Sequence, residues 1–517
     1  MRRTGLTLVS MAAAGVLVAA CGTGGTPGTD ASTGQTSQAA TPPDSRLNLN
    51  ATVNIQLALE PTSLNIFSTA GAALDQILLD NVYQELVSVN PADKDAIVPE
   101  LATSWNTSPD GLTYTFHLVH DATFHDHTPL TAADVVWSLD QQIAPGSIAT
   151  YASSYSSIAS VAAPDPYTVR INLKHRDTFL LWNLTQRGGI VFKQGTRFTS
   201  LSGAENGSGP FTLAQWNRGS SITLSRDSSY WGPKPKVATV VFHYISDPNA
   251  ANNAERTGQT DIETRPDPTL LQPFAGNSGF TVLRGSTTDK YTLAFNDAVA
   301  PFTNPDVRHA IRQAIDNADV ISAFGAGTLI GSDVPPQDPW YADLTSIDAH
   351  NPANAKKLLA AAGYPNGLNL TLTVPNIYHT TISDVVTSEL KQVGINVTVK
   401  QVEFQTWLSQ VFTNHQFQLS IVDHAEARDI YNYANPQYYF GYHSPQVQQW
   451  YAQAQTAGSD ADRNALLAKV ARQISTDAAS DWLFLAQAIT IVRTGVYGVP
   501  TVETTNRYDL STLAVAR

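Results

Sequence analysis

A run of alternating strands and helices in the second half of the chain constrains the fold more than any other feature. Apolar segments typical of strands, residues 368–374, 395–401 and 417–422, are separated by two segments with helical apolar spacing, residues 380–394 and 403–414. Strands that are joined through a helix by short connections run in the same direction. This β-α-β-α-β order therefore predicts a parallel, doubly wound sheet with right-handed connections.

The same topology predicts where a ligand would bind. In an open parallel sheet, ligands bind beyond the carboxyl ends of the strands. The loops at that edge follow Val374, Gln401 and Val422. The polar residues that we expect along this rim are Tyr378, Glu403, His424, Glu426, Arg428 and Asp429.

The third of these loops, "DHAEARD" at residues 423–429, concentrates charge in a chain with only 15% charged residues. Three interpretations are open: a solvated loop, an acid/base active site, or a polar clamp for a ligand. The predicted position at the carboxyl edge of the sheet favours a loop that faces a ligand.

Start signals mark several helices outside this run. Asn304 and Asn351 each precede a proline, which is the pattern of an N-cap followed by proline at the first helical position. Thr131 stands three residues before Asp134, the spacing of a capping box. Apolar spacing also predicts a helix over residues 73–87. Further strands are expected at residues 52–58, 113–119, 167–173 and 237–245.

The N-terminal residues 1–20 have a positive start and an apolar run typical of a secretory signal peptide, too short to span a membrane as a helix. The stretch "LVAAC", which ends at the single cysteine, Cys21, resembles the lipobox of bacterial lipoproteins, in which the cysteine is acylated. An ordinary signal peptide with an incidental cysteine is the alternative. Residues 21–47 are rich in Gly, Thr, Ser and Pro, which predicts a flexible linker behind the acylated cysteine.

Length, charge and motifs narrow the classes of protein. A chain of 517 residues is expected to form two or three lobes, and its net charge of −13 argues against nucleic acid as a partner. The chain has no Gly-x-Ser-x-Gly, P-loop or His-Glu-x-x-His motif. Glu426 and Asp429 form a poor glycosidase-like acid pair, because both lie on one loop. We therefore expect neither enzymatic activity nor a cofactor.

Four blocks of the chain carry recognisable motifs. Residues 97–139 contain Pro-x-Leu-Ala-x-x-Trp, from Pro99, and Thr-Ala-x-Asp-Val, from Thr131. The other three are residues 207–232, with Gly-Pro-Phe and Tyr-Trp, 293–316, with Val-Arg-x-Ala-Ile, and 351–367, with Ala-Lys-x-Leu-Leu and Ala-Gly-Tyr. In this order they resemble the family 5 extracellular solute-binding proteins, the peptide- and nickel-binding components of ABC importers. His117, His120, His125 and His127 fall in the first block and its framework, so we expect no metal site there.

The resemblance implies an α/β fold with two lobes, like that of the periplasmic binding proteins (type II, the large three-subdomain form), and a hinge between the lobes. We place lobe I at residues 48–292 and 488–517, lobe II at residues 293–487, and the hinge strands at residues 291–296 and 485–492. Closure of the lobes over a ligand would present a different surface to a membrane permease.

The resemblance also implies a role for the charged loop. In dipeptide-binding members an acid of this loop accepts the amino terminus of the peptide, and the register places that acid at Glu426, with Asp429 as the second choice. A buried ammonium needs such a partner, because an unpaired charge in a closed cleft is costly. The alternative is that Glu426 pairs with Arg428 and only holds the loop.

Two departures from the family pattern concern the ligand. The chain has "EARDI" where the family has Asp-x-x-Asp-Pro. It also has Thr373, Val374 and Pro375 where dipeptide binders carry an arginine that grips the ligand carboxylate. Either Arg428 takes that role or the ligand has no free carboxylate.

Aromatic side chains are expected to line the rest of the cleft, because they combine a flat apolar face with a polar edge. Trp407 lies on a predicted helix and therefore also suits the core, and Phe67 would approach the cleft from lobe I. The complete set of predicted ligand-binding residues is Glu426, Asp429, Arg428, His424, Tyr378, Trp407, Tyr431 and Phe67.

The sequence thus predicts a monomeric, non-enzymatic binding subunit of an ABC importer. It would be held outside the cytoplasm at the cell membrane through lipid on Cys21, and would deliver an oligopeptide or peptide-like solute to a permease. The alternatives are a regulatory or structural role of the same fold at the cell envelope, and a non-peptide solute such as an opine, a sugar or a metal chelate.

Overall fold

The computed structural model describes residues 38–517, except residues 70, 95, 202–205 and 379. The predicted signal peptide, Cys21 and most of the predicted linker lie outside the described residues. The fold described below is that of the compact unit from Gln35 to Arg517. Within the described ranges no helix combines the length and the apolar character that a membrane crossing requires.

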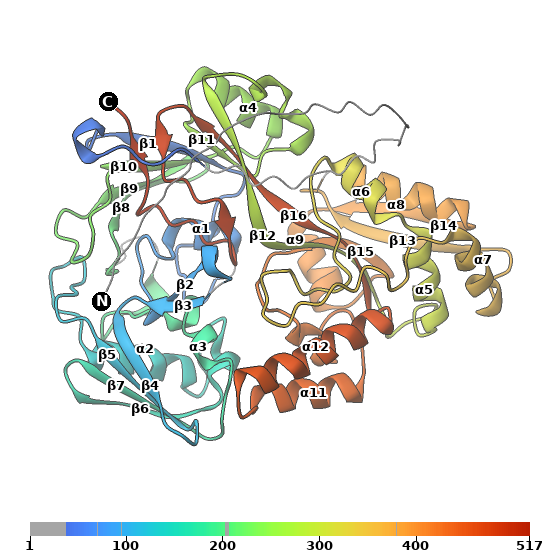
Figure 1. Cartoon of the computed structure of the whole chain (residues 1–517), viewed down its shortest axis with the longest axis horizontal. Helices are drawn as coiled ribbons and strands as arrows, with labels where there is room; N and C mark the ends of the chain where they lie inside the picture. The colour runs from blue at the N-terminus through green and yellow to red at the C-terminus, as the bar shows by residue number, and fades with distance from the viewer. Residues whose placement is uncertain (1–37, 70, 95, 202–205, 379) are drawn as a thin grey trace, which may run out of the picture. The chain divides into compact units, whose positions relative to one another are not determined.

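A large mixed sheet dominates this unit, and eleven of the described strands belong to it. Ten of them follow one another in the order β14-β13-β15-β12-β16-β11-β1-β10-β9-β8, and β18 pairs with β12 outside this path (Figure 1). Their bounds are β1 Thr52–Leu57, β8 Phe211–Asn217, β9 Ser221–Arg226, β10 Thr239–Tyr244, β11 Ile262–Thr264, β12 Phe280–Phe295, β13 Leu368–Pro375, β14 Ile395–Val402, β15 Leu419–His424, β16 Ser480–Arg493 and β18 Val502–Glu503.

The β-α-β-α-β prediction is confirmed in the part of the sheet formed by β14, β13 and β15. Strand β13 runs parallel to both of its neighbours. Helix α8, Thr380–Gln392, joins β13 to β14 and ends before Gly394, which has a φ of +90°. The second connection is α9, Phe404–Trp407, continued by a π-helical turn, Leu408–Thr413.

The helices cover both faces of this part of the sheet, as a doubly wound arrangement requires. Ile421 of β15 packs in a hydrophobic cluster with Ile382 and Val386 of α8. Its neighbour Val422 packs in a second cluster with Trp407. Because successive side chains of a strand point to opposite faces, the two clusters lie on opposite sides of the sheet.

Strands β12 and β16 are the longest in the sheet, and they pair antiparallel, with two register shifts, from Phe280 with Arg493 to Ala294 with Ser480 (Figure 1). Their register shifts between Ser286 and Lys290. On one side of this shift, Leu283 packs with residues of the first half of the chain. On the other side, residues such as Leu293 pack with the second half, so the two strands run through both groups of core residues.

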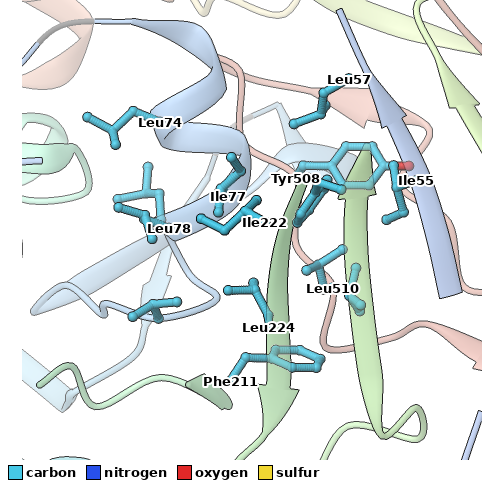
Figure 2. Close-up of a cluster of buried hydrophobic side chains, with 14 of the residues drawn as sticks. Ile55, Leu57, Leu74, Ile77, Leu78, Phe211, Ile222, Leu224, Tyr508 and Leu510 are labelled. Atoms are coloured by element: carbon cyan, nitrogen blue, oxygen red, sulfur yellow. The ribbon is translucent and has the colours of Figure 1, made fainter. Parts of the chain in front are cut away.

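The end of the chain is built into the core that its first half forms. Figure 2 shows side chains of β1, α1 and β9, such as Ile55, Ile77 and Ile222, gathered around Tyr508 and Leu510. Tyr508 and Leu510 are fully buried there. The residues that follow β16 therefore return to pack with the first strands of the protein.

The remaining elements complete the unit. A four-stranded antiparallel sheet has the order β4-β5-β7-β6, and α2 packs against its strands β6 and β7. The bounds are β2 Val87–Asn90, β3 Ala96–Pro99, β4 Ala102–Thr107, β5 Thr113–Leu118, β6 Ile158–Asp165, β7 Thr168–Leu173, β17 Val496–Tyr497, β19 Ala514–Val515, α1 Ala72–Leu78, α2 Ala132–Ile143, α3 Leu180–Asn183, α4 Pro248–Thr257, α5 Pro305–Ala314, α6 Asn317–Phe324, α7 Pro352–Ala361, α10 Tyr431–Ala434, α11 Pro445–Gln455 and α12 Asp460–Thr476.

The predicted helix starts are confirmed, but one predicted helix is too long. Asn304 and Asn351 cap α5 and α7 through their side chains, and the Asp134 carboxylate accepts a hydrogen bond of 2.9 Å from the Thr131 N–H at the start of α2. The helix predicted over residues 73–87 ends at Leu78. The backbone is already extended at Leu79, the C-cap, and the next residue, Asp80, has a left-handed φ of +62°; its carboxylate lies beside Arg507.

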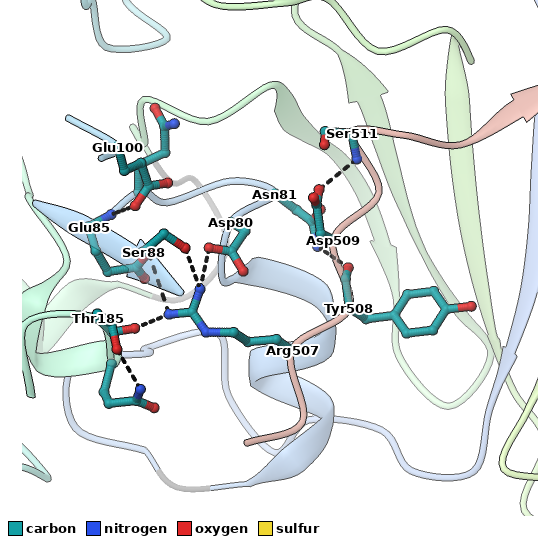
Figure 3. Close-up of polar contacts among 12 residues, drawn as sticks. Asp80, Asn81, Glu85, Ser88, Glu100, Thr185, Arg507, Tyr508, Asp509 and Ser511 are labelled. Atoms are coloured by element: carbon teal, nitrogen blue, oxygen red, sulfur yellow. Dashed lines mark hydrogen bonds and ion pairs between the residues drawn. The ribbon is translucent and has the colours of Figure 1, made fainter. Parts of the chain in front are cut away.

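That contact belongs to a buried network of charges, shown in Figure 3, which joins the C-terminal segment to the first half. The Arg507 guanidinium lies 2.5 Å from Asp80 Oδ1 and 3.8 Å from Glu85 Oε2, and it also donates to the carbonyl oxygen of Thr185. The Glu85 N–H donates to Glu100 Oε2 over 3.0 Å.

Three carboxyl groups thus share one guanidinium. Oxygens of Asp80, Glu85 and Glu100 all lie within 4.8 Å of one another. Burial, together with the negative charge of Asp80, raises the pKa of Glu100 to about 8. The carboxyl group of Glu100 therefore retains its proton at neutral pH. The Arg507 guanidinium already supplies the positive charge that a cation would bring to these three carboxyl groups.

We expect this network to make stability depend on pH. Because folded Glu100 holds its proton to higher pH than the unfolded chain does, the free energy of unfolding should fall as pH rises from about 5 to about 8. Urea denaturation across this range should show a smaller fall for Glu100→Gln than for the natural protein. An Asp384→Asn variant, altered on the exposed face of α8, serves as the control, and equal slopes for all three proteins would contradict the assignment.

Candidate ligand-binding site

The loops at the carboxyl ends of β13, β14 and β15 meet at one edge of the sheet, where the topology predicts a rim. Asn376, after β13, donates through Nδ2 to Glu403 Oε1, after β14, over 2.8 Å. The Tyr378 hydroxyl accepts a hydrogen bond of 3.2 Å from the N–H of Asp423 at the end of β15. These two bonds bring the three loops side by side.

A buried lysine organises the charged loop that follows β15. Lys290 of β12 lies opposite His424 in the sheet and is fully buried. Its Nζ donates to Asp429 Oδ1 over 2.8 Å and to the carbonyl oxygen of Glu426 over 2.7 Å. Burial opposes the charge on Lys290, but the Asp429 carboxylate outweighs it and raises the pKa of the lysine. The pair fixes both ends of the segment from Glu426 to Asp429.

This lysine was not among the predicted site residues. It interrupts an apolar strand in "DKYTLAF", and a charged residue at such a position is a signal that sequence analysis could have used.

Asp333 was also missing from the predicted site residues. It lines the same small space as Lys290 and Asp429, and its carboxylate oxygens have no hydrogen-bond partner among the described residues. Burial and the charge of Asp429 raise the pKa of Asp333 well above its ordinary value.

Arg428 is held between two tryptophan rings and a carboxylate. Its guanidinium carbon lies 3.8 Å from the ring centroid of Trp182, on α3, and 5.5 Å from that of Trp340. Its Nε lies 3.7 Å from Asp338 Oδ1. Asp338 thus supplies a carboxylate beside Arg428. Trp182 belongs to the first half of the chain, so Arg428 joins distant parts of the sequence.

His424 is buried among aromatic rings. Its Nε2 lies 2.9 Å from the Tyr439 hydroxyl, and the two rings stack at an angle of 12°. Burial lowers the pKa of His424 to about 4. The imidazole is therefore neutral at physiological pH and contributes packing and one hydrogen bond rather than a charge.

Glu426 and Tyr431 differ from their neighbours because their side chains are exposed. The Glu426 carboxylate lies within 4.8 Å of His424 and Asp429, at the open side of the loop. Its charge also reaches the first half of the chain: burial raises the pKa of the Tyr151 hydroxyl to about 12, and Glu426 adds to this rise. Tyr431 is 46% exposed and adds an aromatic surface beside the acid.

Two predicted contact residues lie in hydrophobic clusters. Phe67 stacks on Phe198 with ring centroids 3.7 Å apart. Trp407 is buried against β15, and its Nε1 donates to Ser420 Oγ over 2.9 Å, so the structure places it in the core that the sequence offered as the other option. The ligand-binding roles of these two residues, like those of the other predicted contacts, stay predictions.

The arrangement suits binding and not catalysis. His424, Glu426 and Asp429 could bring three ligand atoms to a metal ion, but the Lys290 ammonium already occupies the Asp429 carboxylate. Nearby cations are paired in the same way, because Arg187 forms an ion pair with Asp75. The Glu426 carboxylate is exposed, and its charge, with that of Asp75, helps raise the pKa of Arg187.

Comparison with known proteins identifies the family. The model of the bacterial extracellular solute-binding proteins, family 5, matches residues 96–449. The chain belongs to this family. Family 5 consists of binding proteins and not of enzymes, which agrees with the role predicted from the sequence.

Individual relatives of this family 5 protein support both the family and the fold. A putative ABC transporter peptide-binding protein of Brucella ovis is 30% identical over 331 residues, which span 61% of this chain and 62% of the relative. Among solved structures, DppA of Helicobacter pylori in complex with the peptide STSA has a TM-score of 0.81 at 24% identity and covers 91% of this chain and 99% of its own. AgaA of A. tumefaciens R10 in complex with agropinic acid has a TM-score of 0.79 at 25% identity, with coverage of 90% and 99%. The predicted α/β fold of type II periplasmic binding proteins is confirmed.

We expect the Lys290–Asp429 pair to be needed for the stability of the site. In Lys290→Met the Asp429 carboxylate is left buried without its partner, which should lower the free energy of unfolding by about 3–5 kcal/mol. Chemical denaturation measures this loss. The double variant Lys290→Met, Asp429→Leu should recover part of it, and additive losses in the two single variants would contradict the coupling.

Proposed function

We propose that this family 5 protein is the lipid-anchored substrate-binding protein of an ABC importer. It captures an oligopeptide or peptide-like solute in a cleft between lobe I, residues 48–292 and 488–517, and lobe II, residues 293–487, and delivers it to a membrane permease. The Brucella relative, a putative ABC transporter peptide-binding protein, and the Helicobacter protein in complex with a peptide support the transport class and the peptide. The protein acts as a monomer and has no nucleic-acid partner.

The observation that carries the proposal is the charge state of the rim. Glu426 presents an exposed carboxylate, while the cations around it are held by other acids. Lys290 pairs with Asp429, and Arg428 lies beside Asp338. A ligand that brings an ammonium group to Glu426 would balance the remaining charge, and desolvation on closure would strengthen the interaction.

The contacts of Arg428 also bear on how the carboxyl end of a peptide would be bound. The segment from Thr373 to Pro375 supplies no cation, and Arg428 is stacked on Trp182 and Trp340. A ligand carboxylate would have to displace these contacts to reach the guanidinium. The ligand therefore binds through its amine and its neutral groups, and a free carboxylate adds little to the affinity.

Strands β12 and β16 are the elements on which closure would turn. They are the longest strands of the sheet, they run through the core residues of both halves, and their register shifts between Ser286 and Lys290. Small rotations at this shift would open and close the cleft without disturbing either core. A permease that prefers the closed form would then distinguish loaded from empty protein.

Lipid anchoring rests on the sequence. The lipobox-like "LVAAC" ends at Cys21, which would carry the acyl chains after removal of residues 1–20. Two or more acyl chains suffice for stable attachment to a bilayer. Residues 21–47 would tether the folded unit at the extracytoplasmic face of the cell membrane.

Ligand titration tests the transport class. Thermal unfolding of the purified protein should shift upward with peptide pools, because a ligand present at 100 times its Kd stabilises the folded state by about 2.7 kcal/mol. A shift with opines, sugars or metal chelates instead would change the solute; the agropinic acid complex of AgaA makes opines the first alternative. If no solute of any class stabilises the protein, a regulatory or structural role replaces transport.

We expect Glu426→Gln to weaken an amine-bearing ligand by about 2–5 kcal/mol, because the substitution removes the charge that faces the ammonium. Calorimetry with a peptide and with its N-acetylated form measures the effect, which should appear only for the free amine. Glu403→Gln is the matched control, since Glu403 is an exposed acid of the same rim that hydrogen-bonds Asn376. Equal affinities of the Glu426→Gln variant and the natural protein would remove Glu426 from the site.

A further inference from the structure

Residues 176–179, directly before α3, contact the end of α11 in the second half of the chain. Thr178 donates its backbone N–H to the carbonyl oxygen of Gln455 over 2.9 Å, and its hydroxyl to that of Ala454 over 2.8 Å. In the proposed division of the protein, Thr178 belongs to lobe I and α11 to lobe II. The two bonds therefore join the lobes away from β12 and β16, through residues 276 positions apart.

The carbonyl groups that Thr178 binds belong to the last turn of α11. The last four carbonyl groups of a helix have no partner within the helix, so they accept hydrogen bonds from other donors. For Ala454 and Gln455 a donor comes from the first half of the chain. The end of a lobe II helix is thus capped by a residue of lobe I.

Arg176 contacts both lobes with one guanidinium group. Its Nη2 donates to the carbonyl oxygen of Asp110 in lobe I over 2.9 Å, and its Nη1 to that of Gly458, between α11 and α12, over 3.1 Å. Arg463 of α12 donates in the opposite direction, from Nη1 to the carbonyl oxygen of Thr178 over 3.3 Å. A positive charge near the C-terminal end of a helix is favourable, because the carbonyl groups there carry partial negative charge.

An aromatic contact accompanies these hydrogen bonds. Phe179 stacks on Tyr451 of α11, with ring centroids 5.6 Å apart and an angle of 13° between the rings. Phe179 also packs against a hydrophobic cluster whose other members lie between Ala294 and Leu485. A side chain of lobe I therefore belongs to the packing of lobe II.

The shape of the segment is set within the first half of the chain. The Asp177 carboxylate, in a residue that is 9% exposed, accepts a hydrogen bond of 2.7 Å from Ser157 Oγ and one of 2.9 Å from the Phe179 N–H. Neither bond involves α11. The donors of Thr178 are therefore positioned by lobe I alone, before the lobes meet.

Every donor and acceptor in these contacts belongs to the chain, so the contacts form with the approach of the lobes and not with a ligand. If the lobes turn apart at the register shift of β12, the bonds to α11 break, whereas β12 and β16 stay paired. A ligand that binds only the closed arrangement has an apparent affinity proportional to the fraction of closed protein. Contacts that raise this fraction therefore raise the affinity.

We propose that residues 176–179 form a clasp with the end of α11 and hold the lobes together, so that part of the ligand-free protein is already closed. The clasp strengthens the binding of every solute alike, because none of its residues is among the predicted ligand contacts. The inference rests on the proposed function, to which the lobes and the hinge belong. The members of the clasp are Arg176, Thr178, Phe179, Tyr451, Ala454, Gln455, Gly458 and Arg463.

Double electron–electron resonance between two spin labels, without ligand, tests the clasp. The labels are attached at Asp140→Cys on α2 and Asp384→Cys on α8, which are exposed positions of different lobes, and Cys21→Ser removes the single natural thiol. The clasp variant combines Thr178→Val and Arg176→Gln. Relative to the population whose label distance matches the structure, the open population should rise at least about threefold in this variant, because two hydrogen bonds between the lobes are lost.

Single substitutions separate the clasp from a general loss of structure. Thr178→Val alone should shift the populations in the same direction by less, whereas Thr178→Ser retains the hydroxyl and should match the labelled parent. Arg170→Gln is the matched control for Arg176→Gln, since it removes an exposed arginine of β7 in the same lobe. Equal populations in the clasp variant and the parent would overturn the proposal, as would a Thr178→Ser protein that opens like Thr178→Val.

Because the measurement needs no ligand, the clasp and the transport role can fail separately. If peptides stabilise the protein but the clasp variant shows no change in its label distances, the transport role stands and the clasp is wrong. If the label distances shift as expected but no solute stabilises the protein, the clasp stands and the capture of a solute is wrong.

Discussion

The ion pair between Lys290 and Asp429 is the interaction on which the candidate site depends. Both groups are buried, so each would be costly to hold in the charged state without the other. Lys290 belongs to β12, the long strand shared by both groups of core residues, whereas Asp429 lies in the loop after β15. The pair therefore fixes the loop to the most central strand, and with the loop held from inside, the side chain of Glu426 points outward.

Buried ion pairs elsewhere serve the same structural end. Arg187 pairs with Asp75, Arg507 with Asp80, and Arg428 with Asp338 and two tryptophan rings. Each joins segments that lie far apart in the sequence, and each uses a positively charged side chain for a contact inside the protein. Among the described residues near the rim, Lys290, Arg187 and Arg428 thus each lie beside an acid within the protein.

The sequence predicted what depends on local patterns and on strand order. The alternation of strand-like and helix-like apolar segments was enough to predict that β13, β14 and β15 are parallel. Ligands bind beyond the carboxyl ends of such strands, and this rule pointed to the loops after β13 and β15, which the hydrogen bond from the Asp423 N–H to the Tyr378 hydroxyl brings together. It could not predict Lys290 as the partner of Asp429, or Trp182 beneath Arg428, because those contacts join residues more than 130 positions apart. The apolar spacing after Ala73 also continues past Leu78, where the backbone becomes extended at Leu79, so the pattern alone overextends the helix.

Two features of the candidate site concern a ligand carboxylate: the residues at the end of β13 and the surroundings of Arg428. Dipeptide binders would use an arginine near the end of β13 for the ligand carboxylate, and this chain has Thr373, Val374 and Pro375 there. Arg428 is the cation that the sequence offers in its place, but its guanidinium lies over Trp182 and Trp340, and its backbone is left-handed, with a φ of +57°. A guanidinium stacked on two rings and balanced by Asp338 gains little from a second carboxylate. The Arg428 guanidinium is therefore part of the packing between the charged loop, Trp182 and Trp340.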